Sequence, residues 1–316
     1  MTSIPQWLQS EPGDYVLEAQ LPLKHRFLRW LGRQTWIYRG HDRLLRLVYN
    51  PDANKHFKFE VDFFGQRYRG DLGHFIDWNV FCYGSYAYHE LLLLRDIARE
   101  LKMLRAAPIS FYDVGANVGN HTLFMAPHVD KIFAFEPFAL VRALIEDKIA
   151  LNGLTNVTIF PFALGETDGD VPYYPSPDGN SGAGTLIENR LSTSADPAIV
   201  QIRRGDSFLK KESLPRIDLI KADVEGFEAF VFRGLSDRIR QDKPAIILEI
   251  SEDSRKGFGS EDAFRKTFYE SALFAEVAGG NGRPYRLKPF KYGTAAEVLV
   301  MPPEMSGIMK KLTHGA

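Results

Sequence analysis

Cysteine is almost missing from this chain of 316 residues, since Cys82 is the only one. A single thiol excludes an intramolecular disulfide and a metal cluster held by several thiolates. The sequence also lacks a run of about 20 apolar residues that could span a bilayer. Residues 1–20 lack the basic and then apolar order of a signal peptide. Together these absences lead us to expect a cytoplasmic protein.

A charge excess of either sign is missing too. The chain has 39 Lys and Arg residues against 40 Asp and Glu residues, which gives a formal net charge of -1. Nothing global therefore attracts it to nucleic acid, and we expect no nucleic-acid partner. What is present is ordinary for a globular protein, because 45% hydrophobic and 25% charged residues in a chain of this length can bury a large core.

From Ile109 onward, short apolar runs alternate with segments of helical periodicity. The runs have the length of buried strands: ISFYDVG, KIFAFEP, VTIFPFALG, IDLIKADVEG and AIILEIS. This alternation predicts an α/β fold with a mostly parallel, doubly wound sheet whose ligands lie at the carboxyl ends of the strands. Near the end, the helical segment EDAFRKTFYESALF precedes two candidate strands, YRLKP and EVLVMPP, for which we expect an antiparallel hairpin.

The first hundred residues follow a different pattern, which predicts an N-terminal α+β extension over residues 1–105 and a main domain over residues 106–316. Residues 21–50 carry seven Lys and Arg residues against the single acid Asp42. Two interpretations remain open, a weak peripheral membrane contact and the solvated basic face of a packed helix. Residues 58–86 alternate apolar and polar side chains around glycines, which predicts a short antiparallel meander.

The segment FYDVGANVGNHTLFMA, residues 111–126, has the pattern of a strand, a glycine-rich turn and a helix, an arrangement that often holds a phosphate. However, Asn117 stands where a dinucleotide site needs its second glycine, and no lysine follows Gly119 as a triphosphate loop requires. Asp113 before the first glycine suits an ammonium group better than a phosphate. The zwitterionic methionine part of S-adenosylmethionine matches a turn that offers both N–H donors and an acid.

Glu136 ends the next apolar run, KIFAFEP. In nucleotide-binding α/β units, an acid at the end of the second strand accepts hydrogen bonds from a ribose diol. Capping of a helix that begins at Pro137 would explain the same residue, so both roles remain open.

Five segments resemble the signature of the FkbM family of S-adenosylmethionine-dependent methyltransferases: DVGANVGNHT, FEP, LNGLTNV, FALG and IDLIKADVEGFEAFVFRG. The resemblance runs from about Phe59 to Ser251. It implies a class I methyltransferase (Rossmann-like) fold, with a seven-stranded, mostly parallel sheet and a C-terminal antiparallel hairpin. It also implies O-methylation of a hydroxyl of a sugar, glycolipid, polysaccharide or secondary metabolite.

The resemblance implies cofactor-binding roles for residues in four of these segments. They are Asp113, Gly115, Asn117 and Gly119 at the methionine part, Glu136 at the ribose, and Asn152, Phe162 and Ala163 near the adenine. Asn152 equally suits a helix C-terminus with no ligand. His121, at the start of a helix, has two open roles, orienting a bound molecule and capping the helix.

The segment LIKADVEGFE contains the residues expected to act in catalysis. Methyl transfer from a sulfonium requires that the acceptor be aligned and its proton removed. Asp223 is our first candidate for this base, and Glu225 is the second. Glu228 and Glu249 are further candidate acids. A structural role, in which they bind a helix N-terminus or Lys221, would also explain their presence. Clustered acids also suit Mg²⁺, but no complete ligand spacing is visible and we expect no metal.

Other functions remain open to different degrees. Nucleobase N-methylation is disfavoured, because DVEG stands where such enzymes place Asn or Asp before Pro-Pro and an aromatic residue. A nucleotide-dependent oxidoreductase on a related fold is disfavoured by Asn117, and a catalytically inactive, methyltransferase-like binding protein is an open alternative. We expect the loop 173–186 and the N-terminal extension to cover a small-molecule, glycan or glycolipid acceptor. The basic segment 21–50 suggests that the acceptor or its lipid is anionic, whereas the oligomeric state stays unknown.

Overall fold

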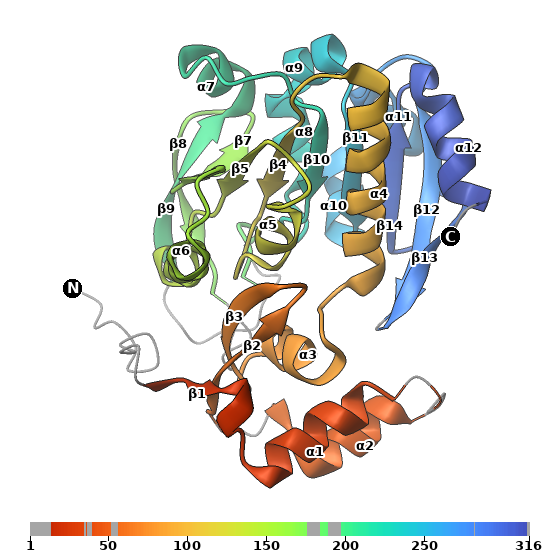
Figure 1. Cartoon of the computed structure of the whole chain (residues 1–316). Helices are drawn as coiled ribbons and strands as arrows, with labels where there is room; N and C mark the ends of the chain where they lie inside the picture. The colour runs from red at the N-terminus through yellow and green to blue at the C-terminus, as the bar shows by residue number, and fades with distance from the viewer. Residues whose placement is uncertain are drawn as a thin grey trace.

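The computed structural model shows an α/β protein built around one large sheet (Figure 1). It describes residues 14–34, 36, 40–51, 56–175, 184–188, 197–280 and 282–314. The predicted fold class is confirmed. Arg39 and residues 1–13 and 176–183 lie outside the described residues, so the predictions for the start of the chain and for most of the loop 173–186 stay predictions.

The large sheet has eight strands in the described part of the chain, in the order β13-β12-β14-β11-β10-β4-β5-β6. These strands are β4 (Ser110–Val114), β5 (Lys131–Phe135), β6 (Val157–Phe160), β10 (Leu219–Ala222), β11 (Ala245–Ile250), β12 (Leu273–Gly280), β13 (Arg283–Pro289) and β14 (Ala296–Met301). Within this sheet, the neighbouring strands β11, β10, β4, β5 and β6 are parallel. The chain winds outward from β4 in one direction and from β10 in the other, so a ligand crevice is expected where these two strands end.

Both faces of the sheet are covered, as its apolar strands require. Phe111 and Tyr112 are neighbours on β4 and point to opposite faces, where they belong to two different buried clusters. The helices that follow the N-terminal part are α4 (Tyr88–Arg105), α5 (Asn120–Met125), α6 (Ala139–Asn152), α7 (Gly205–Lys211), α8 (Glu228–Gly234), α9 (Ser236–Asp242), α10 (Glu252–Phe258), α11 (Glu261–Thr267), η7 (Pro303–Met305) and α12 (Ser306–His314).

The C-terminal strands differ from the prediction in number and pairing. We expected seven strands with YRLKP and EVLVMPP paired, but β12 lies between β13 and β14 and pairs antiparallel with both. β12 begins inside the segment that we predicted as one helix. α11 ends before Phe268, whose backbone is extended. The helical spacing hid this break because Phe264 and Phe268, on its two sides, are buried in one cluster.

A small second sheet lies beside the large one (Figure 1), in the order β7-β9-β8. Its strands are β7 (Ala163–Gly165), β8 (Gly169–Tyr173) and β9 (Ala198–Arg204). The segment VTIFPFALG, which we predicted as one strand, is divided between β6 and β7. The division falls at Pro161, which has no N–H to continue a ladder.

The described residues of the N-terminal part combine a small sheet with three α-helices and one short 3-10 helix. Its elements are β1 (Val16–Leu17), η3 (Glu18–Gln20), α1 (Leu23–Gly32), α2 (His41–Val48), β2 (Lys58–Phe63), β3 (Gln66–Asp71) and α3 (Phe75–Tyr83). The predicted antiparallel pairing is confirmed for β2 and β3. The meander does not continue, because α3 follows β3 and the third strand is β1, parallel to β2.

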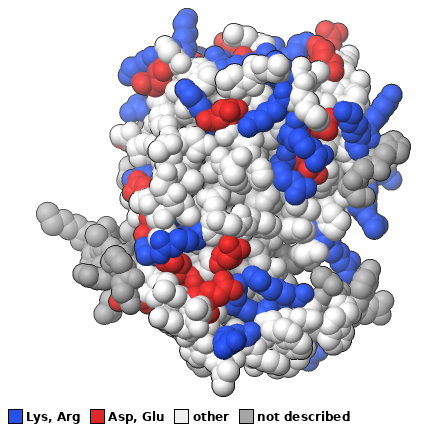
Figure 2. All heavy atoms as spheres, viewed as in Figure 1, with Lys and Arg blue, Asp and Glu red and all other residues white. Residues whose placement is uncertain are grey.

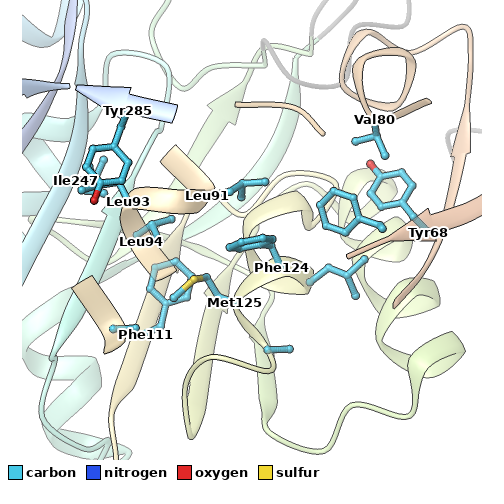
Figure 3. Packing of buried hydrophobic residues seen from close by; sticks show 14 of the residues in the cluster. Tyr68, Val80, Leu91, Leu93, Leu94, Phe111, Phe124, Met125, Ile247 and Tyr285 are labelled. Atoms are coloured by element: carbon cyan, nitrogen blue, oxygen red, sulfur yellow. The ribbon is translucent and has the colours of Figure 1, made fainter. Parts of the chain in front are cut away.

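One buried hydrophobic cluster joins the N-terminal part to the large sheet (Figure 3). Tyr68 of β3 and Val80 of α3 belong to the same cluster as Phe111 of β4. Asn152 adds a polar link, because its side chain accepts from the N–H of Arg67 at 2.8 Å and donates to the carbonyl of Arg67 at 2.8 Å. The two parts thus share one core, and the domain division at residue 105 stays a prediction.

Candidate active site

The glycine-rich turn after β4 is held tightly against its neighbours. Gly115 has a φ of 79°, and its N–H donates to the carbonyl of Phe135 at 3.0 Å. A Cβ at Gly115 would overlap the carbonyl oxygen of Asp223, so the turns after β4 and β10 touch backbone to backbone. Only glycine fits this position, because it needs both a positive φ and no side chain.

Gly119 has a different role in the same turn. It is the N-cap of α5 with a φ of 84°, and a Cβ there would lie 3.0 Å from Cγ2 of Ile145 on α6. Gly119 therefore allows α5 and α6 to pack, and it does not line the cavities described below.

Glu136 lies directly after β5 and next to the turn. Its carboxylate accepts from the N–H of Asn117 at 3.0 Å and from the N–H of Phe138, the N-cap residue of α6, at 2.9 Å. Burial raises the pKa of Glu136 to about 7, although these two N–H donors oppose the rise. The side chain therefore bonds at a helix start, as the capping interpretation expected, and it also faces a cavity.

Two cavities lie on either side of the turn. Both are open to solvent, and the space in and above them that no atom fills is about 550 Å³ for the first and about 650 Å³ for the second. Both are lined by Gly115, Asn117, Asp223 and Glu225. The first also has Glu136, Pro137, Ala163, Leu164, Tyr173 and Phe227 in its lining. The second has Phe75, Ile76, Tyr86, Asn120, His121 and Lys221.

Two buried oxygens at the turn have no hydrogen-bond partner within the described ranges. Asp113 is fully buried in β4, and its Oδ2 accepts from the Thr122 hydroxyl at 2.6 Å, which leaves Oδ1 without a donor. Oδ1 of Asn117 is likewise without one. Buried acceptors are normally paired, so this pair of oxygens fits an incoming group that carries N–H donors. Asp113 itself does not line either cavity.

The three residues expected near the adenine are separated by the structure. Ala163 lines the first cavity. Phe162 points into the core instead, with its ring centroid 4.7 Å from that of Phe208. Asn152 lies outside both linings and bonds to Arg67 of β3. Its amide already binds the N-terminal hairpin, which agrees with the helix C-terminal role, and the role near the adenine stays a prediction.

The acids after β10 also divide by position. Asp223 accepts from Nζ of Lys221 at 3.1 Å, while 33% of its side chain stays exposed. Glu225 has a φ of 54° and lines both cavities. Glu228 is buried and accepts from the N–H groups of Val224 and Gly226 at 3.0 and 3.2 Å, so it binds the turn at the start of α8. Asp223 and Glu225 are thus the acids of this segment that line a cavity.

A third acid, Glu249 of β11, approaches Asp223 and Glu228 closely enough for the three to share an ion. Burial and the charge on Asp223 raise the pKa of Glu249 to about 8. The oxygens of Glu228 are already used, because it also accepts from the Ser254 hydroxyl at 2.5 Å. We therefore assign no metal to this cluster.

A charged network behind the second cavity is not evident from the sequence. Lys221 is buried, which lowers the pKa of its ammonium group, but the surrounding carboxylates, with Asp223 first, raise that pKa above its ordinary value. Glu90 of α4 lies 3.4 Å from Nε2 of His121, and although burial opposes it, this histidine lowers the pKa of Glu90 to about 2. The network balances charge around Lys221. Its members come from α4, α5 and the sheet, and no local motif connects them.

The family model of the methyltransferase FkbM domain matches residues 113–276, slightly more than half of the chain. The chain belongs to the FkbM methyltransferase family. The resemblance seen in the sequence is thereby confirmed, and the matched range of this FkbM methyltransferase contains both acids that line the two cavities.

Curated relatives of this FkbM methyltransferase share moderate identity with it. The hexuronic acid methyltransferase AglP of Haloferax volcanii is 30% identical over 142 residues, which cover 44% of this chain and 54% of that protein. Methyltransferase 1 of Beauveria bassiana is 29% identical over 181 residues, 52% of this chain and 71% of that protein. The chain thus matches only about half the length of AglP.

A solved structure of the FkbM methyltransferase from Methylobacillus flagellatus aligns with 61% of this chain and 43% of its own, at 12% identity and a TM-score of 0.41.

Proposed function

We propose that this FkbM methyltransferase uses S-adenosylmethionine to methylate a hydroxyl group of a sugar, glycolipid, polysaccharide or secondary metabolite. The observation that carries the proposal is the pair of cavities that meet at Gly115, Asn117, Asp223 and Glu225. One cavity suits the cofactor, the other suits the acceptor, and the acids that both share lie where transfer would occur.

The first cavity has the chemistry that the cofactor needs. Glu136 suits the ribose hydroxyls, because its carboxylate is buried and already positioned by two N–H donors. Ala163 and Leu164 offer an apolar wall for the adenine, with Tyr173 and Phe227 as aromatic neighbours. Asn117 lines this cavity, and its unpaired Oδ1 suits the ammonium group of the methionine part. Asp113 lies outside the lining, so its cofactor role stays a prediction.

The second cavity suits a polyhydroxylated acceptor. Phe75 and Tyr86 supply aromatic surface, and Asn120 and His121 supply polar groups. The described lining contains one Lys or Arg side chain, Lys221, which is paired with Asp223. This composition favours a hydroxylated ring inside the cavity. The relative named a hexuronic acid methyltransferase supports a sugar as the first class to test.

Catalysis by this chain would rest on alignment and proton removal. S-adenosylmethionine supplies the methyl group on a positively charged sulfur. Asp223 would accept the proton of the attacking hydroxyl and hold the oxygen in line. Lys221 keeps the Asp223 carboxylate in position from the buried side, and Glu225 provides a second acceptor for the substrate.

Loss of the Glu136 carboxylate tests the cofactor directly. In Glu136→Ala we expect S-adenosylmethionine to bind about tenfold or more weakly by calorimetry, because one charge-assisted acceptor for the ribose is removed. Glu212→Ala, at an exposed glutamate, is the matched control and should bind as the wild type does. NAD should give no heat with any of the three. A folded wild type that does not bind S-adenosylmethionine would contradict the proposal and favour the inactive binding protein, whereas NAD binding would favour the oxidoreductase.

The pH dependence of this binding follows from the same residue. The pKa of Glu136 is raised to about 7, so the folded protein favours the protonated carboxyl more than the unfolded chain does. Glu136 therefore lowers the free energy of unfolding as pH rises from about 4.5 to about 7. The ionised form is the better acceptor for ribose hydroxyls. We therefore expect affinity for S-adenosylmethionine to rise between about pH 6 and about pH 8 in the wild type.

Glu136→Gln provides the control, because glutamine keeps the shape and does not titrate. The affinity of Glu136→Gln for S-adenosylmethionine should change less with pH than that of the wild type. Any change with pH that comes from titration of the ligand itself should be the same in both proteins. Equal slopes for the wild type and Glu136→Gln in calorimetry would show that Glu136 does not contact the cofactor.

A further inference from the structure

The exposed large apolar side chains of this protein are concentrated at its N-terminal helices. Six of them form what we call the apolar stripe: Leu23, Phe27, Trp30, Trp36, Leu44 and Leu47. Leu23 is 81% exposed, Trp36 73% and Leu47 78%. Isolated exposed apolar residues are normal on proteins, but a contiguous group marks an interaction surface.

The three residues of the stripe on α1 share one face of that helix. Leu23, Phe27 and Trp30 follow each other at i, i+4 and i+7, and the rings of Phe27 and Trp30 lie 5.8 Å apart. The opposite face packs into the core through Leu28 and Leu31. The exposed face is therefore not needed for folding of this helix.

The second helix extends the stripe. α2 buries Leu45, whereas Leu44 and Leu47 are exposed. α1 and α2 lie side by side at one end of the molecule (Figure 1). The two helices thus present their apolar side chains at a single end of the protein.

Positive charge accompanies the stripe. Lys24, Arg26, Arg33 and Arg43 are exposed on or beside the same helices, and the acid of this segment, Asp42, is paired with Arg46 at 2.8 Å. Figure 2 shows uncharged surface with Lys and Arg groups beside it at this end of the molecule.

Arg29 does not belong to the basic face that the sequence suggested. It is 5% exposed, donates to the carbonyl of Phe81 at 3.0 Å and pairs with Glu18 at 2.6 Å. Arg29 therefore holds α1 onto the core and does not face a partner.

We propose that α1 and α2 dock on the surface of an anionic lipid membrane. Exposed Trp, Phe and Leu side chains insert at the boundary between headgroups and acyl chains, and the surrounding Lys and Arg side chains bind anionic headgroups. The contact is peripheral: within the described ranges, no helix combines the length and apolar character needed to cross a bilayer.

This docking has a consequence for the second cavity. α3 packs on α1 and supplies Phe75 and Ile76 to the lining of that cavity. The docking surface and the lining of the second cavity are thus connected through α3. The docking itself goes beyond methyl transfer and does not depend on it.

Sedimentation of the full chain with vesicles tests the apolar part of the proposal. We expect the wild type to sediment with vesicles of phosphatidylcholine and phosphatidylglycerol, and Leu23→Ser/Leu47→Ser to bind them about tenfold or more weakly. Met103→Ser/Leu104→Ser, which removes two exposed apolar side chains from the end of α4, is the matched control and should bind as the wild type does. Circular dichroism melting of each variant verifies that it is folded.

Charge reversal tests the lipid class. Arg26→Glu/Arg33→Glu should lose binding to the phosphatidylglycerol vesicles by about tenfold or more, and added salt should weaken the wild type in the same way. Arg286→Glu/Lys288→Glu on β13 makes the same charge change elsewhere and should have little effect. The proposal is overturned if the folded wild type does not sediment with anionic vesicles. It is also overturned if Arg26→Glu/Arg33→Glu binds these vesicles as tightly as Arg286→Glu/Lys288→Glu does.

Light scattering identifies the competing occupant. A different result would be a wild type that is a dimer in solution, a Leu23→Ser/Leu47→Ser variant that is a monomer, and no vesicle binding by either protein. This result would assign the stripe to a second copy of this chain and overturn the membrane proposal.

Discussion

Asp223→Asn is expected to lower methyl transfer by about a hundredfold to ten-thousandfold, the range in which a general base contributes. Asparagine keeps the size of the side chain but cannot take a proton from a hydroxyl. Lys221, which pairs with Asp223 at 3.1 Å, still has Glu90 and Asp113 nearby to balance its charge. The buried network should therefore survive, and the loss should appear in kcat rather than in cofactor affinity.

The measurement is transfer of labelled methyl groups from S-adenosylmethionine to a panel of hexose and hexuronic acid glycosides, with calorimetry in parallel. Asp237→Asn is the matched control, because Asp237 is an exposed aspartate on α9 with 73% of its side chain in solvent. Nearly full turnover by Asp223→Asn would remove Asp223 as the base and leave Glu225 as the next residue to replace.

Gly115→Ala is expected to damage both folding and cofactor binding. The residue has a φ of 79°, and the new Cβ would overlap the carbonyl oxygen of Asp223. The strained backbone and the overlap together should lower the free energy of unfolding by about 3 kcal/mol or more. Relief of the overlap would move the turn after β10, so the two cavities would change shape and S-adenosylmethionine binding should be lost.

Gly153→Ala separates the two causes. Gly153 has a φ of 60°, but nothing lies within 4 Å of the position that its Cβ would take. It should cost about 1 kcal/mol from backbone strain alone, with binding intact. Urea denaturation gives both values. If Gly115→Ala were no more harmful than Gly153→Ala, the close contact between the turns after β4 and β10 would not be essential to the site.

Local patterns predicted the parts of this protein that depend on neighbours in sequence. The buried strands β4, β5, β10 and β11 are readable because short apolar runs stand between helical segments. The turn at Gly115 and the acid Glu136 are readable because each directly follows a strand. Membership of the FkbM family rests on the same segments and is confirmed.

The parts that depend on distant partners were missed or misplaced. β12 was absorbed into a predicted helix, because its pairing with β13 and β14 leaves no local sign. The contact between Asn152 and Arg67 joins residues 85 positions apart. Tyr86 and Glu90 precede the range 113–276 that the family model matches. They reach the second cavity or its network through packing of the N-terminal part on the sheet. The roles of the site residues stay predictions until they are measured.

The attachment of helix α4 to the last strands affects how the chain can be made in a cell. The hydroxyl of Tyr285 donates to Asp96 at 3.0 Å, and Nζ of Lys311 donates to Glu100 at 2.6 Å. Residues 88–105 therefore leave the ribosome long before the segments that cover them have been translated. Until β12, β13 and α12 have been translated, the part of the helix that packs on them stays in water, where it is open to chaperones and to aggregation.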